Sequence, residues 1–166
     1  LDAVTAYTQG LANADRMLGE LVDYIDQRER PTVLLFYGDH IPTLGTNRAA
    51  YYETGVVGGA VPYSQQLAYL YSTPFLICSN TGAVSGLLPE ERGNQISTYY
   101  LLDVVAEMTG FRQTPYMELL GEYYRRVPYY NIRLEQEQTE EIAALARMHE
   151  MITYDRLLGE RYSVSK

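Results

Sequence analysis

The chain contains the run Thr32-Val33-Leu34-Leu35-Phe36-Tyr37, followed at once by Gly38-Asp39-His40. The run is apolar on both faces and rich in β-branched and aromatic residues, which is typical of a central strand in a covered parallel sheet. Before it, apolar residues recur at three- and four-residue steps from Val4 to Ile25. This spacing predicts an amphipathic helix over residues 3–27, and Pro31 prevents it from continuing. A helix that leads into a buried strand is half of an α/β unit.

Turn signals and helical spacing predict the other elements. Thr73-Pro74 favours extended backbone and Asn80-Thr81-Gly82 forms a turn, so a second strand is expected at residues 75–79. A short strand at 67–71 can precede it. Apolar spacing, capping residues and terminal glycines predict three more helices, over residues 98–108, 115–126 and 139–158. The segment 38–59 has the composition of a long loop, with a short helix near 48–53.

Together these elements predict an α/β fold. Its largely parallel sheet is expected to be incomplete at one side, flanked by helices and closed by the long C-terminal helix. In the helix over 98–108, the apolar face is expected at Leu101, Leu102, Val105 and Met108. An exposed sheet edge can pair with a second copy of the chain, so a dimer formed through that edge is one expectation.

The composition limits the classes of function. A chain of 166 residues corresponds to about one domain, and its 13 basic and 21 acidic residues give a net charge of −8 that opposes nucleic-acid binding. The longest apolar run, from Val33 to Tyr37, is far shorter than the roughly 20 residues that span a bilayer. A single cysteine, Cys78, excludes an internal disulfide. The chain begins at Leu1 without a signal-peptide pattern, so we expect a piece of a longer protein.

Asp39 and His40 are the residues with the clearest chemical potential. They follow the expected strand directly, at the strand end where ligands bind in open α/β sheets. A carboxylate oxygen and an imidazole nitrogen suit Zn²⁺ or Mn²⁺. Gly38 and Pro42 allow the chain to turn there, so that both side chains can reach one ion. The residues alone also fit an Asp-initiated turn beside an ordinary histidine.

Other reactive side chains have simpler interpretations. His149 lies in the middle of a helix and is expected to be a surface or satisfied histidine, and Cys78 lies inside a strand and is expected to be structural. Arg125-Arg126 fits a solvated helix end, although it can also meet an anion. The 17 tyrosines, against 3 phenylalanines, suit either the rim of a core or a surface that faces carbohydrate.

The order of segments resembles the sulfatase branch of the alkaline phosphatase superfamily, in particular the lipoteichoic acid synthase and phosphoglycerol transferase group. The segment from Tyr37 to Leu44 resembles that group's metal-binding strand end. Residues 7–25 are similar to the family's preceding helix, and residues 71–80 to its segment of tyrosine, threonine-proline, apolar strand and asparagine. Residues 97–102 and 154–162 resemble a later serine-led helix and the closing helix end.

The resemblance implies a partial alkaline-phosphatase-like (sulfatase) sheet, with residues 1–166 as the C-terminal portion of the catalytic domain. It also implies that Asp39 and His40 are metal ligands, with Mn²⁺ favoured and Zn²⁺, Mg²⁺ or Ca²⁺ as other candidates. In the family the nucleophile, a threonine or modified cysteine, lies well upstream of these ligands. Thr5 and Thr8 do not match that motif, so we assign no catalytic residue and expect this fragment to be inactive by itself.

The implied parent enzyme transfers phosphoglycerol-type groups or hydrolyses phosphate esters, with an anionic lipid, phosphoglycerol or sulfate ester as substrate. The resemblance places it at the extracellular face of the cell membrane, anchored by helices upstream of this chain. One alternative is a sulfatase that hydrolyses sulfate esters with the same metal pair. An alternative of another class is a non-catalytic cell-wall or carbohydrate binding module, in which tyrosines contact sugars and Asp39-His40 is only a turn.

Overall fold

The computed structural model describes residues 2–82, 95–129 and 139–164. The chain divides into two compact units, Leu1–Gly82 and Ala83–Lys166. The first contains α1 (Asp2–Asp26), β1 (Val33–Tyr37), η1 (Thr46–Arg48), α2 (Ala49–Glu53), α3 (Tyr63–Tyr71) and β2 (Phe75–Ser79). The second contains η3 (Thr98–Tyr100), α4 (Leu101–Thr109), α5 (Pro115–Arg126) and α6 (Glu140–Leu157). The expected α/β class, with flanking helices and a long C-terminal helix, is confirmed.

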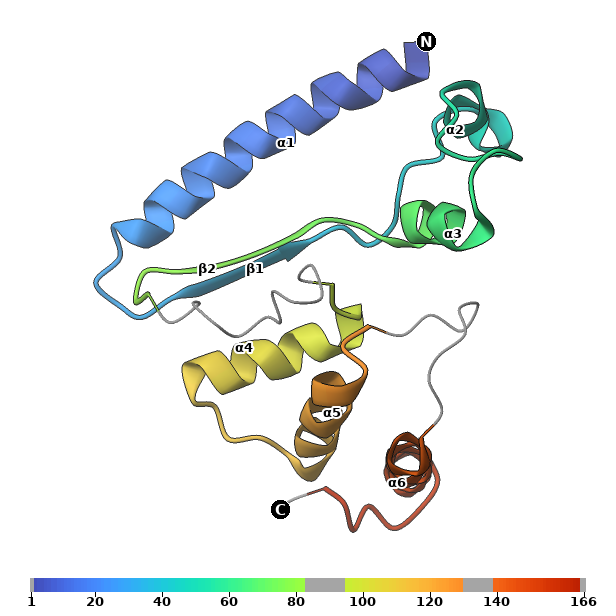
Figure 1. Ribbon diagram of the computed structural model, residues 1–166. Coiled ribbons are helices and arrows are strands. Elements are labelled where there is room, and N and C mark those ends of the chain that lie inside the picture. Colours follow the sequence, from blue (N-terminus) through green and yellow to red (C-terminus); the bar gives the residue numbers. More distant parts are fainter. Residues whose placement is uncertain (1, 83–94, 130–138, 165–166) are drawn as a thin grey trace. The chain divides into compact units, whose positions relative to one another are not determined.

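In the first unit, β1 and β2 form a two-stranded antiparallel sheet (Figure 1). Val33 pairs with Ser79 at one end of the sheet, and Tyr37 pairs with Phe75 at the other. The prediction of a largely parallel sheet is therefore wrong for these two strands. The chain leaves β1 at Gly38 and enters β2 through Pro74, whose carbonyl oxygen accepts a hydrogen bond of 3.1 Å from the Gly38 amide. Both ends of the connection thus lie at the same end of the sheet, which makes the strands antiparallel.

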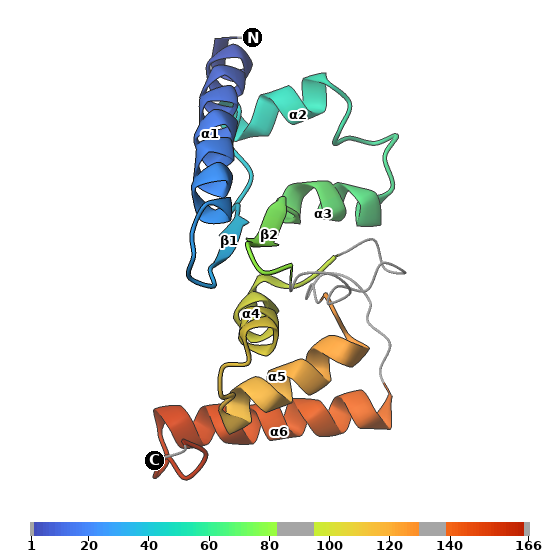
Figure 2. The same ribbon diagram turned by 90° about the vertical axis from the view of Figure 1, so that its left-hand side faces the viewer.

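The connection between the strands also differs from expectation. Residues 67–71, expected as a short strand, belong to helix α3. Pro62 precedes this helix with extended backbone, and Leu67 is its buried residue. Prolines are well suited to the start of a helix because they lack the N–H that a helix leaves unpaired there. In Figure 2, α2 and α3 follow one another along the chain segment that connects β1 to β2.

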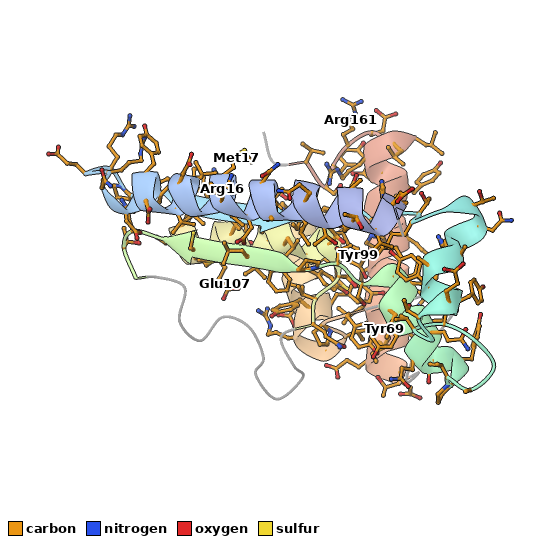
Figure 3. All side chains as sticks on the ribbon, turned by 90° about the horizontal axis from the view of Figure 1, so that it is seen from above. Arg16, Met17, Tyr69, Tyr99, Glu107 and Arg161 are labelled. Carbon is orange, nitrogen blue, oxygen red and sulfur yellow. The ribbon has the colours of Figure 1, made fainter. Side chains whose placement is uncertain are left out.

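Helix α1 packs on the sheet mainly through its C-terminal end. Ile25 is its buried residue, whereas Leu11 and Met17 are 55% and 59% exposed; Figure 3 labels Met17. Asn80 joins the helix exit to the sheet. Its side-chain oxygen accepts a hydrogen bond from the Thr32 amide (2.9 Å), and its Nδ2 donates to the Arg28 carbonyl (2.8 Å). The apolar stripe toward the N-terminus of α1 is largely uncovered by the described residues.

The second unit has its own apolar core. Tyr100 is fully buried and its ring lies 5.7 Å from that of Tyr124, while Leu101 and Val104 of α4 are also buried. Gly110 adopts a left-handed conformation at the end of α4, as its place in the sequence predicts. Leu102, expected on the buried face, is instead 67% exposed. Several apolar stripes fit the spacing of this short helix, and tertiary packing selects the stripe that contains Leu101 and Val104.

Helices α5 and α6 begin as their sequences predict. The hydroxyl oxygens of Thr114 and Thr139 accept hydrogen bonds from backbone amides three residues later. Arg126 of α5 links the two helices through an ion pair with Glu141 of α6, and it is also paired with Glu122 of its own helix. Among the described helices, none combines the length and apolar character needed to cross a bilayer.

Candidate metal site at the end of strand β1

Gly38 and Thr73 fix the backbone from which the candidate site projects. The Thr73 hydroxyl donates a 2.7 Å hydrogen bond to the Gly38 carbonyl oxygen. A Cβ atom at position 38 would lie only 3.0 Å from the Thr73 Cβ, which is closer than ordinary van der Waals contact. Glycine therefore allows the segment before β2 to pass tightly against the end of β1. This contact holds the start of the next turn in place.

Asp39 and His40 lie at that turn and approach one another. The Asp39 Oδ1 atom accepts a 2.9 Å hydrogen bond from the His40 amide, which folds the carboxylate back over the backbone. Asp39 Oδ2 lies 3.5 Å from His40 Nε2. The side chains are 83% and 77% exposed, respectively, so both donor atoms remain accessible. Two adjacent residues of a straight strand would point to opposite faces, and the turn after Gly38 removes that obstacle.

The donor atoms are suited to a shared divalent ion. The His40 Nδ1 atom lies 3.0 Å from the Ile41 carbonyl oxygen, which can only accept, so the hydrogen bond requires the ring proton on Nδ1. In the neutral tautomer with its proton on Nδ1, the nitrogen beside Asp39 is the one that carries the lone pair, as metal coordination requires. Two ligand atoms about 2.1 Å from one ion in a tetrahedral arrangement lie about 3.4 Å apart. The separation between Asp39 Oδ2 and His40 Nε2 matches this value.

No third ligand joins Asp39 and His40 among the described residues. Within residues 2–82, 95–129 and 139–164, no group of three or more His, Cys, Asp or Glu side chains gathers in a way that could hold a metal ion. A pair of ligands leaves the remaining coordination positions to water, to substrate or to other protein groups. The pair can therefore bind an ion weakly and leave room for reacting groups.

The other sequence candidates have structural roles. The Nε2 atom of the second histidine, His149, lies 3.1 Å from the Tyr116 hydroxyl oxygen. This contact confirms the prediction that His149 has its own hydrogen-bond partner within the fold. Cys78 pairs with Leu34 in the sheet, and burial raises the pKa of its thiol, which disfavours the reactive thiolate. Arg125 and Arg126 are paired with Glu122, so they form a salt-bridged helix end.

Sequence reasoning missed one buried carboxyl group, Asp103 in α4, which is 2% exposed. An acidic residue in the first turn of a helix is ordinarily explained by the positive helix end. Its burial depends on the packing of α4 against α5, which a single sequence does not reveal. Burial, reinforced by the nearby Glu107 charge, raises the pKa of Asp103.

Comparisons with known proteins agree with the resemblance. Residues 2–111 match the family model described as Sulfatase. The chain is also 27% identical, over 178 aligned residues, to a Rhizobium meliloti (strain 1021) protein named for cyclic beta-1,2-glucan modification. That alignment covers 98% of this chain and 26% of the relative, so the chain spans about a quarter of the relative's length. No solved structure matches the chain significantly.

Proposed function

Because the chain belongs to the sulfatase family, we propose that Asp39 and His40 are ligands of its divalent metal ion. Enzymes of this family generally use such an ion, and membership indicates an enzyme. The observation that carries the proposal is the 3.5 Å separation of Asp39 Oδ2 and His40 Nε2 at one exposed turn. Zn²⁺ and Mn²⁺ both suit this mixed oxygen and nitrogen pair. The resemblance to phosphoglycerol transferases favours Mn²⁺, with Zn²⁺, Mg²⁺ and Ca²⁺ as alternatives.

The residues of this chain would position the ion. Asp39 supplies a negative oxygen ligand, and His40 supplies a neutral nitrogen whose ring is oriented by the Ile41 carbonyl oxygen. Thr73 and Gly38 hold the turn against the sheet. When bound, a divalent ion stabilises charge on a transferred phosphoryl or sulfuryl group and lowers the pKa of an attacking hydroxyl.

For the whole protein, we propose transfer of phosphoglycerol-type groups, or hydrolysis of phosphate esters, at the extracellular face of the membrane. The similarity of the segment from Tyr37 to Leu44 to phosphoglycerol transferases supports this reaction, with an anionic lipid or phosphoglycerol as donor. The relative named for cyclic beta-1,2-glucan modification favours a glycan as the acceptor. Hydrolysis of a sulfate ester is the alternative reaction at the same metal pair.

A Mn²⁺ titration followed by electron paramagnetic resonance tests the metal ligands. We expect the 166-residue chain to bind one Mn²⁺ with a dissociation constant of about 0.1 to 1 mM, as weak sites with few protein ligands do. His40→Ala and Asp39→Ala should each weaken binding by at least about tenfold, or about 1.4 kcal/mol. His149→Ala is the matched control, because it removes the other histidine of the chain and should leave Mn²⁺ binding unchanged. Equal binding by the His40 and His149 variants would refute the proposal.

We further propose that the 166-residue chain does not turn over substrate by itself, because it contains no match to the family's nucleophile motif. Bis-p-nitrophenyl phosphate and p-nitrophenyl sulfate, with 1 mM Mn²⁺ present (about the expected dissociation constant), should release no p-nitrophenol above background. Hydrolysis that disappears in His40→Ala would overturn this part and would identify a nucleophile within the chain.

A further inference from the structure

A cavity in the second unit is lined by residues that are distant in sequence from Asp39 and His40, and it includes neither of them. It is formed by α4, α5 and the segment that connects them, and its volume is about 510 Å³. This lies within the range of roughly 300 to 1,000 Å³ that is usual for small-molecule sites. Small-molecule sites usually have a few converging polar groups in their walls, and the wall of this cavity includes the carboxyl group of an otherwise buried aspartate.

Asp103 is the polar group that the cavity makes available. Its Oδ1 atom accepts a 3.1 Å hydrogen bond from Gln113 Nε2. Within the described part of the chain, Asp103 Oδ2 accepts no hydrogen bond. Every fully buried side-chain oxygen in that part has a hydrogen-bond partner. Oδ2 must therefore retain some accessible surface, and Asp103 lines the cavity. Gly121 leaves this atom uncovered, because a Cβ atom there would lie 2.9 Å from Oδ2.

The rest of the wall carries charges of both signs. Glu107, which Figure 3 labels, lies one helical turn beyond Asp103, and Glu118 comes from α5. Arg112 and Arg125 provide guanidinium groups, and the guanidinium of Arg125 is also ion-paired with Glu122. An anionic ligand would meet three carboxyl groups, and a cationic ligand would meet two arginines. This mixture favours an uncharged ligand that both donates and accepts hydrogen bonds.

Phe111 adds an apolar surface to the same cavity. Phe111 is one of the residues that line the cavity, and it is 75% exposed. An exposed aromatic ring provides a flat face against which the C–H face of a sugar ring can pack, while carboxylates and guanidinium groups bind the sugar hydroxyls. We propose that the cavity between α4 and α5 binds a neutral saccharide, with Asp103 Oδ2 accepting from a hydroxyl and Phe111 packing on the ring. The inference goes beyond the proposed metal chemistry and uses neither Asp39 nor His40.

Calorimetric titration of the 166-residue chain with the neutral disaccharides cellobiose and sophorose tests the site. At least one should bind with a dissociation constant of the order of 1 mM. Glucosamine and glucose 6-phosphate, compared with glucose, should bind more weakly because each carries a charge. EDTA should not affect binding, which separates this site from the metal pair.

Two variants and a matched control locate the bound sugar. Asp103→Asn keeps the shape and the Gln113 contact but turns an amide donor toward the cavity, so we expect binding at least about tenfold weaker. Phe111→Ala alters an exposed residue and should weaken binding about fivefold without unfolding the chain. Leu102→Ala, on the same helix as Asp103 but outside the cavity wall, should bind as the unaltered chain does. Absence of binding by the unaltered chain, or equal binding by the Phe111 and Leu102 variants, would overturn the proposal.

Discussion

Thr73 is the residue on which the position of the Asp39-His40 turn most directly depends. Its hydroxyl bonds to the carbonyl oxygen of Gly38, immediately before the two candidate ligands. Its Cβ also lies against Gly38, where a larger residue would not fit without displacement. One threonine thus supplies both a polar contact and a steric limit at the end of β1.

Replacing Thr73 by valine should loosen this turn. Thr73→Val keeps the branched shape but leaves the Gly38 carbonyl oxygen without its hydroxyl donor, so we expect about 1 kcal/mol lower stability. Binding of Mn²⁺ should weaken by about threefold, because the ligand pair is less well positioned. Thr73→Ser retains the hydroxyl and is the matched variant, expected to bind Mn²⁺ close to normally. Urea unfolding and the Mn²⁺ titration measure both effects, and valine and serine variants that behave alike would contradict this role.

At the scale of elements, sequence patterns located most of the helices and both strands. The helix before Pro31, the strand at Phe75–Ser79 and the helices after Thr114 and Thr139 all follow from local signals. These signals are sufficient because capping residues, prolines and apolar spacing act within a few residues of one another. The approach of the Asp39 and His40 side chains to one another was predictable for the same reason, because Gly38 and Pro42 indicate a turn beside them.

Features that depend on distant contacts were not predictable. A single sequence does not specify whether the long connection from β1 returns to the same end of the sheet, so the direction of β2 was missed. The apolar residues of α3 resembled a strand, because Leu67 to Tyr71 is too short to distinguish the two periods. The burial of Asp103 and the cavity beside it depend on α5, and no pattern in α4 reveals them.

Two helical glycines should respond in opposite ways to replacement by alanine, because one of them, Gly121, lies where α5 contacts α4. Alanine in place of a helical glycine ordinarily stabilises by about 0.5 to 1 kcal/mol. Gly19→Ala in α1 should show this gain, because a Cβ there meets nothing within 4 Å. Gly121→Ala should instead destabilise by about 1 to 3 kcal/mol, since its Cβ would press on the buried Asp103 carboxylate. Urea unfolding followed by circular dichroism measures both, and stabilisation by both changes would show that α4 and α5 pack less closely.

At the scale of the whole chain, the two units differ in the size of their cores. Among the described residues, three buried apolar residues lie in the first unit: Ile25, Val57 and Leu67. Nine lie in the second, including Tyr100, Val104 and Leu120. The Asp39-His40 pair thus lies on the unit with fewer buried apolar residues, whereas the proposed saccharide cavity is built on the unit with more.

This difference predicts unequal hydrogen exchange, because local opening is easiest where few apolar contacts are buried. Amides of α1, β1 and β2 should exchange faster than those of α4 and α5 in a mass-spectrometric experiment.

A ligand that binds only the folded state stabilises it according to its concentration, by about 1.4 kcal/mol at ten times the dissociation constant. Mn²⁺ should therefore slow exchange in β1 and β2, leave α4 and α5 unchanged, and have no effect on His40→Ala. Equal protection of both units without metal would contradict the difference in cores, and slowing of α4 and α5 by Mn²⁺ would show that the units are energetically coupled.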